Sequence, residues 1–233
     1  MQNDLEILVL AAITISFLHT VTGPDHYLPF VALSKSRGWS FSKTIGWTIV
    51  CGCGHIGSSV LLGLGGAAIG WSFSKINALE SVRGGIAGWT LLSFGLLYAT
   101  WGLIKANQNR RHKHFDIQED GSVYVSEHRH GELVMPKERH KLTPWVLFII
   151  FLLGPCEPMI PLLYFPGARN SFPAMLLLIL IYTFFTLVTM VLMVALGYYG
   201  ISIFKTNKLE RYMHALGGAT IFICGLGMVF MGW

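Results

Sequence analysis

The sequence predicts an all-α polytopic membrane protein with six transmembrane helices, arranged as a 3+3 inverted repeat in which helices 1 and 4 are broken. Composition is the first reason. Of the 233 residues, 53 % are hydrophobic and only 12 % charged, and the mean hydropathy is +0.55, whereas about a quarter of the residues in soluble domains are charged. The second reason is a series of apolar runs long enough to span a bilayer. The third is that Gly23-Pro24 and Gly154-Pro155 interrupt the first and fourth runs at corresponding places.

The predicted spans follow one another along the chain at 5–34, 44–71, 84–103, 144–165, 174–204 and 212–233. The first is long enough to cross once with a break in its middle. Proline causes such a break because it lacks the amide hydrogen that a helix needs and disfavours helix at the preceding residue. Because each half has three spans, the two halves cross the membrane in opposite directions. This favours an inverted repeat in which the two broken helices face each other. We therefore expect a first repeat at 1–104, a polar segment at 105–142 and a second repeat at 143–233.

The distribution of lysine and arginine predicts the orientation. With both termini outside, fourteen of the seventeen Lys and Arg fall in cytoplasmic loops, where membrane proteins carry their excess positive charge. The same placement accounts for the net charge of +5 without nucleic acid as a partner. The N-terminus is acidic and no convincing cleavage site follows, so we expect the first run to be retained and not removed as a signal peptide. The predicted location is the cell (inner) membrane, with multiple spans.

Ionisable residues gather at the first break, in the stretch from His19 to His26 that also holds Asp25. Such side chains are costly at membrane depth, so they indicate function. Imidazole and carboxylate are the ligand set that suits divalent zinc, nickel, cobalt or iron. His55 in the second span supplies a further imidazole. A proton relay uses similar residues, and a single transmembrane histidine often serves only as a hydrogen-bonding partner between helices.

The second break repeats the pattern, because Cys156 and Glu157 follow Gly154-Pro155 as Asp25 and His26 follow Gly23-Pro24. Of the twelve acidic residues, we expect only Asp25 and Glu157 at the centre of apolar segments. Cys156 and Glu157 are therefore candidates to complete a metal site or to bind at one stage of transport. Two unrelated proline kinks are the plainer interpretation.

The polar segment 105–142 holds five of the nine histidines: His112, His114, His128, His130 and His140. Two His-x-His pairs are among them. Tracts of this composition bind metal loosely, so metal buffering or sensing is one hypothesis. A polar linker with scattered histidines is the other.

Two of these stretches resemble a known family. HTVTGPDH at 19–26 is similar to the His-x4-Asp-His signature of nickel/cobalt permeases (the NicO/NiCoT-like transporters), and GCGHIGSSV at 52–60 resembles their second-helix histidine motif. The resemblance extends to urease-accessory-H-like and sulfite-exporter-type transmembrane proteins, over nearly the whole chain. This chain differs in having five residues between His19 and Asp25, and Cys156-Glu157 in its second half. The resemblance implies transition-metal transport through His19, Asp25, His26 and His55, and leaves its direction open.

The leading hypothesis is thus a permease for a divalent transition metal. Nickel or cobalt is the preferred candidate for the transported ion, followed by zinc. The expected partners are the metal ion, as substrate, and the lipid bilayer. A sulfite-type small-anion exporter is the alternative. Its discriminating feature would be cationic groups or helix N-termini at mid-membrane, where we expect no lysine or arginine. A transmembrane thiol-disulfide electron relay using Cys156 is another. We expect no enzymatic activity, since no His-Glu-x-x-His helix is present. The coupling ion and the oligomeric state stay open.

Overall fold

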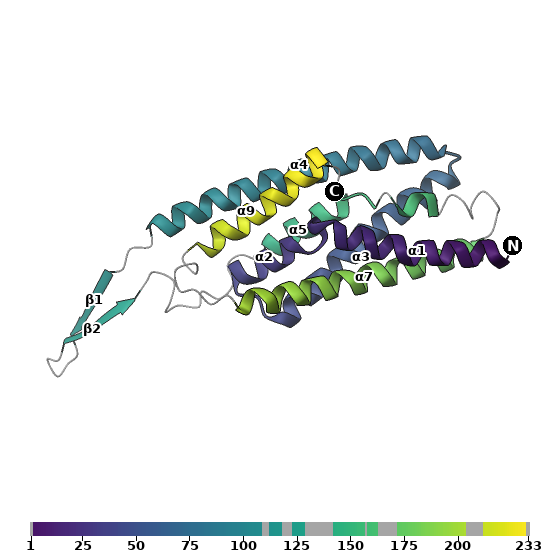
Figure 1. Ribbon diagram of the computed structural model, residues 1–233. Coiled ribbons are helices and arrows are strands. Elements are labelled where there is room, and N and C mark those ends of the chain that lie inside the picture. The colour runs from purple at the N-terminus through teal and green to yellow at the C-terminus, as the bar shows by residue number, and fades with distance from the viewer. Residues whose placement is uncertain are drawn as a thin grey trace.

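The computed structural model is a bundle of helices with a two-stranded hairpin at one end and the N-terminus at the other (Figure 1). It describes residues 2–108, 112–117, 123–128, 142–156, 158–162, 172–203 and 212–231. Five helices in this part of the chain are long and apolar enough to cross a membrane, which confirms the prediction of a mainly helical chain of multi-pass composition.

The helices are α1 (Gln2–Thr22), α2 (Leu28–Arg37), α3 (Phe41–Ala68), α4 (Phe73–Gln108), α5 (Leu142–Leu153), α7 (Phe172–Ile203) and α9 (Met213–Leu226). A 3-10 turn, η1 (Pro24–His26), separates α1 from α2, and a π-helical turn, η2 (Gly227–Met231), follows α9. At 12 residues, α5 is about 18 Å long and is too short to cross by itself. The chain is helical again over residues 159–162.

The main difference from the predicted spans is the length of α4, which has 36 residues and begins at Phe73 instead of Gly84. The segment 73–83 reads as a polar loop, but it contains good helix formers such as Ala78 and Leu79. Two of its three charged residues, Glu80 and Arg83, form an ion pair across one helical turn. The polar side chains of this segment therefore do not prevent it from forming the first turns of α4.

Helices α4 and α9 lie side by side along most of the length of α9 (Figure 1). Four glycines make this close approach possible, because a Cβ atom at any of them would collide with backbone of the other helix. The contacts are Gly95 with Phe222, Gly102 with Ala215, Gly218 with Ala99 and Gly225 with Leu92. Small residues at a helix contact are typical of packing in membranes, where dispersion between closely approaching backbones contributes most of the attraction.

The outer surface of the bundle is strongly apolar. Large side chains such as Leu61, Leu97, Leu196 and Phe230 are each exposed by 68–74 %. A soluble monomer rarely exposes so many contiguous apolar side chains, so this surface matches a lipid environment.

Two clusters of buried residues fill the interior. The first joins α2, α3, α4, α5, α7 and α9 around residues such as Phe30, Leu91 and Met190. The second lies around Ile56, Met159 and Tyr182. The buried polar side chains of His26 and His55 belong to the candidate site described below.

The hairpin differs from the predicted polar linker. Strands β1 (His112–Ile117) and β2 (Val123–His128) pair antiparallel, with His112 opposite His128 and Ile117 opposite Val123. Both strands contain β-branched and aromatic residues, which favour extended backbone. His130 and His140 lie outside the described residues. Whether the segment binds metal stays a prediction, as do the limits at 104 and 142.

Candidate metal centre

The backbone changes direction at the Gly-Pro sequence after α1. The amide of Gly23 still donates to the carbonyl of His19 at 3.0 Å, but Pro24 has no hydrogen to donate and begins η1 instead. The amides of His26 and Tyr27 then close this short turn by donating to the carbonyls of Gly23 and Pro24. His19 thus lies in the last turn of α1, and His26 lies in the turn that follows it.

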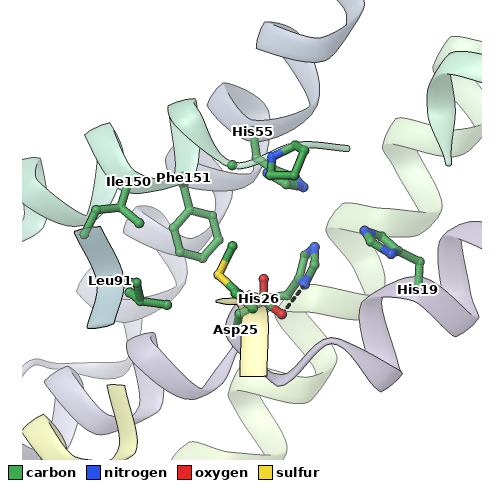
Figure 2. A pocket seen from close by; sticks show the side chains of 10 residues that line it. His19, Asp25, His26, His55, Leu91, Ile150 and Phe151 are labelled. Carbon is green, nitrogen blue, oxygen red and sulfur yellow. Dashed lines mark hydrogen bonds and ion pairs between the residues drawn. The ribbon is translucent and has the colours of Figure 1, made fainter. Parts of the chain in front are cut away.

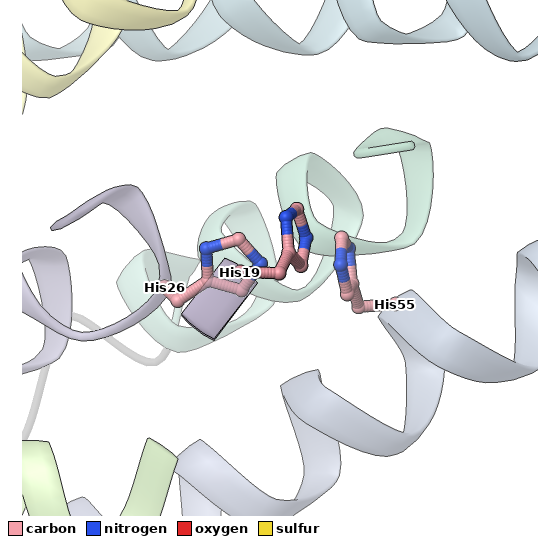
Figure 3. A group of neighbouring side chains, drawn as sticks. All are labelled: His19, His26 and His55. Carbon is pink, nitrogen blue, oxygen red and sulfur yellow. The ribbon is translucent and has the colours of Figure 1, made fainter. Parts of the chain in front are cut away.

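Three imidazoles from two parts of the chain meet here (Figure 3). The ring centroids of His19 and His26 are 4.8 Å apart, and those of His26 and His55 are 5.1 Å apart. One ring nitrogen from each histidine lies within 4.8 Å of the other two. Metal–nitrogen bonds of about 2.0–2.1 Å place two ligands roughly 3.3 Å apart in tetrahedral geometry, so the rings must move closer together to bind a common ion.

The Nε2 atoms of His19, His26 and His55 are all buried, and among the described residues none has a hydrogen-bonding partner. Buried polar atoms in native proteins are nearly always paired, so each exception requires an explanation. Three such atoms from three side chains in one place point to a ligand that the three share. A metal ion accounts for all three at once, because a neutral imidazole binds a metal through the lone pair of such a nitrogen.

Asp25 contacts His26 and thereby orients it. The Nδ1 atom of His26 is 3.2 Å from Oδ1 of Asp25 and 3.1 Å from the carbonyl oxygen of Gly23. Because both partners accept hydrogen bonds, Nδ1 carries the hydrogen and Nε2 keeps its lone pair. A carboxylate behind a ligating histidine is common in metal sites, where it fixes the tautomer and raises the basicity of the ligand.

His55 reaches the site from the middle of α3 and packs against the end of α5. A Cβ atom at Gly154 would lie 3.1 Å from the Nδ1 atom of His55, so glycine leaves room for the imidazole. The hydroxyl of Ser58 donates to the carbonyl oxygen of His55 at 2.8 Å. The position of His55 therefore depends on where α5 ends.

A cavity of about 30 Å³ lies between these side chains (Figure 2). It is lined by His19, Asp25, His26, His55, Leu91, Ile150, Phe151, Gly154, Pro155 and Met228. This volume suffices for one water molecule or one small ion. Polar groups from η1, α1 and α3 face apolar walls from α4, α5 and η2, so an ion here would depend on the histidines for most of its coordination.

Of the predicted site residues, His19, Asp25, His26 and His55 come together around this cavity. Cys156 does not line it. Its thiol donates to the Tyr182 hydroxyl at 3.3 Å, and its amide donates to Oγ of Ser59 at 3.1 Å. Glu157 lies outside the described residues, so its predicted role stays a prediction.

Two residues that the sequence reasoning missed are Glu80 and Arg83. Both lie within the apolar stretch Phe73–Asn107 of α4, and Glu80 is fully buried. Neither lies at the centre of that stretch, so the expectation that only Asp25 and Glu157 lie at the centre of apolar segments stays a prediction, as does the expected absence of lysine and arginine at mid-membrane. The sequence pattern that could have identified them is the pair of opposite charges three residues apart, because a paired acid and base can be buried where a single charge cannot.

No protein-family model, no curated protein and no solved structure matches the chain.

Proposed function

We propose that this protein is a membrane permease for a divalent transition metal ion, with His19, His26 and His55 as the ligands of the ion in transit. The observation that carries the proposal is the set of three buried Nε2 atoms without a protein partner around a cavity of ionic size. Three imidazoles suit nickel, cobalt and zinc better than magnesium or calcium, which prefer oxygen. Nickel and cobalt come first because of the resemblance in the two histidine motifs.

The coordination supports passage more than permanent binding. Structural zinc sites are closed by four protein ligands, whereas the described residues contribute three imidazoles, with Asp25 engaged to His26. A site with an open position exchanges its ion more easily. The carboxylate of Asp25 and a water molecule are then available for the remaining coordination as the ion moves.

The arrangement in the membrane belongs to the same proposal. The first helix is interrupted at Gly23-Pro24, and α5 ends at Leu153, next to Gly154, which lines the same cavity. Helices interrupted at mid-membrane around a substrate site are the usual design of secondary transporters built from inverted repeats. With the charge distribution described above, the hairpin end of the bundle is cytoplasmic and the N-terminus is outside.

Equilibrium binding to the purified protein tests the ligands. In detergent, the wild-type chain is expected to bind one nickel or cobalt ion, and His19→Ala, His26→Ala and His55→Ala are each expected to lose binding. His214→Ala is the matched control, because His214 is hydrogen-bonded to Tyr98 and does not line the cavity. Wild-type affinity in His26→Ala and His55→Ala would exclude this site.

Transport needs a second measurement. Protein reconstituted into vesicles that contain a metal-sensitive dye is expected to move cobalt or nickel across the bilayer, and the His55→Ala variant is expected not to. Tight binding without flux would indicate a resident metal instead of a substrate.

The alternative functions receive less support. Arg83 is a cation within the candidate span of α4, but its guanidinium already contacts Glu80, Ser58 and two carbonyl oxygens, which leaves little capacity to bind a transported anion. A thiol relay needs Cys156 beside a second thiol. Cys51, the buried candidate, packs in the other core cluster.

A further inference from the structure

An ion pair lies inside the bundle beside the end of α5. The Nη1 atom of Arg83 is 2.6 Å from Oε1 of Glu80, and the side chain of Glu80 is fully buried while that of Arg83 is 19 % exposed. Burying two charges is costly unless both find further polar partners. The other contacts of Arg83 therefore indicate what the pair does.

The Nη2 atom of Arg83 connects α4 to two other helices. It donates to Oγ of Ser58 on α3 at 2.6 Å, to the carbonyl oxygen of Leu152 at 2.9 Å and to that of Gly154 at 3.3 Å. The last carbonyls of a helix have no partners within it. Arg83 thus satisfies two acceptors at the end of α5, and cationic side chains are also favoured there by the helix dipole.

The segment that Arg83 holds is part of the wall of the histidine cavity. Gly154 and Pro155 both line that cavity, and Gly154 lies against the ring of His55. Pro155 in turn packs on Gly84 of α4, where a Cβ atom would lie 2.8 Å from Cγ of the proline. Movement of the end of α5 away from α4 would break the contacts of Arg83 and Gly84 together.

A second cavity, of about 640 Å³, lies on the other side of this wall. It is lined by His19, Thr22, Gly23, Ser81, Gly84, Gly85, Trp89, Pro155, Pro158, Met228 and Val229. His19, Pro155 and Met228 line both cavities, so the two adjoin. An ion that passes from the larger cavity to His26 and His55 must pass these three side chains.

We propose that Arg83 is a positioning residue that holds Gly154 and Pro155 closed between the two cavities, and that release of its bonds to α5 admits the ion to the histidines. This inference rests on the proposed function for the identity of the ion. Arg83 acts through the end of α5 and does not contact the ion. Its loss is therefore expected to change the rates of binding and release much more than the affinity.

The first test measures rates with Co²⁺, whose visible absorption reports coordination by imidazole. After rapid mixing, Arg83→Gln is expected to bind and release Co²⁺ about tenfold faster or more, because two hydrogen bonds from a charged donor no longer hold the closed state. Ser58→Ala removes one partner of Arg83, and with it the hydroxyl that donates to the carbonyl oxygen of His55, but it keeps the ion pair and both bonds to α5, so a smaller acceleration is expected. Lys75→Gln is the matched control, because it removes a charge from α4 whose ammonium lies over the ring of Trp71 and which lines neither cavity.

The second test needs no metal. In a Cys53→Ser background, which removes the exposed native thiol, Leu91→Cys places a thiol in the histidine cavity only. Its modification by a small water-soluble methanethiosulfonate is expected to be faster in Arg83→Gln and Ser58→Ala than with arginine and serine present, and unchanged in Lys75→Gln. Ser58→Ala keeps the buried charges paired, so it provides a folded variant if Arg83→Gln is unstable.

The outcomes separate the two proposals. Faster labelling with no Co²⁺ binding by the wild-type protein would retain the role of Arg83 and refute metal transport. Unchanged labelling and unchanged Co²⁺ rates in folded Arg83→Gln and Ser58→Ala would refute the role of Arg83 and leave the metal site intact. Loss of the Co²⁺ spectrum in folded Arg83→Gln would also refute it, since the residue would then build the site and not control access to it.

Discussion

Replacing Gly154 by alanine tests whether the end of α5 positions His55 for metal binding. A Cβ atom at this residue would lie 3.1 Å from the Nδ1 atom of His55 and 3.3 Å from the carbonyl oxygen of Phe151. Ordinary van der Waals contact begins near 3.4 Å. The imidazole must therefore withdraw by about 0.3 Å, or the end of α5 must move outward by the same amount.

To bind one ion, the ring nitrogens of the three histidines, which lie within 4.8 Å of one another, must move closer together, and a methyl group at Gly154 pushes His55 the other way. A displaced His55 is therefore expected to weaken the affinity for nickel or cobalt by roughly tenfold, or about 1.4 kcal/mol. The fold should persist, because one added methyl group at the edge of a cavity causes limited overpacking, of about 1–3 kcal/mol at most sites. Titration of the purified protein with Ni²⁺ and Co²⁺, together with a thermal unfolding curve in the same detergent, measures both quantities.

Gly57→Ala is the matched control, since Gly57 lies on the same helix as His55 and an added Cβ meets no atom within 4 Å. Its metal affinity is expected to equal that of the wild type. If Gly154→Ala also binds with unchanged affinity, the contact between α5 and His55 does not determine ligand position, and the argument from packing fails.

Three further predictions follow from particular contacts. Asp25→Ala is expected to weaken metal binding by about 10–100-fold without abolishing it, because Nδ1 of His26 keeps a carbonyl acceptor. Titration with Co²⁺ measures the affinity, and an unchanged value would contradict the role of Asp25 in orienting His26. Replacing residues 109–141 by a short Gly/Ser linker is expected to preserve insertion into the membrane and metal binding. In the full chain, a cysteine introduced at Gly121 is expected to react with an impermeant maleimide only after cell lysis. Labelling of intact cells would instead place this segment outside and reverse the proposed orientation. Gly102→Leu is expected to lower the thermal unfolding midpoint by several degrees through overpacking against α9, while Gly200→Leu, with open space around it, is not.

Local chemistry made much of the site predictable. The break at Gly23-Pro24 follows from the missing amide hydrogen of proline, and it requires no knowledge of the neighbouring helices. The same holds for the proximity of Asp25 and His26, which are adjacent in the chain. Apolar composition likewise predicted helices able to span a membrane, because only hydrogen bonds within the segment satisfy the backbone there.

The roles of Asp25, Glu80 and Arg83 could not be assigned in the same way. Asp25 lines the cavity as expected of a ligand, and the structure adds that its Oδ1 contacts Nδ1 of His26, which depends on side-chain orientation; its role as a metal ligand stays a prediction. Residues 73–83 were left between the predicted second and third spans, whereas the structure makes them the first turns of α4. The ion pair between Glu80 and Arg83 is a local pattern, but the bonds of Arg83 to Ser58 and to the end of α5 depend on how three helices approach one another.

The sequence alone thus determined where the chain is apolar, where its first helix must stop and which residues with metal-binding chemistry lie at that stop, because these properties depend on near neighbours in the chain. The sequence named His55 as a candidate ligand, but only tertiary structure brings it beside His19 and His26 and bonds Arg83 to the end of α5. Those contacts depend on how closely α3, α4 and α5 approach one another. That approach is set by packing at positions such as Gly84 and Gly154, where the absence of one carbon atom lets distant segments touch.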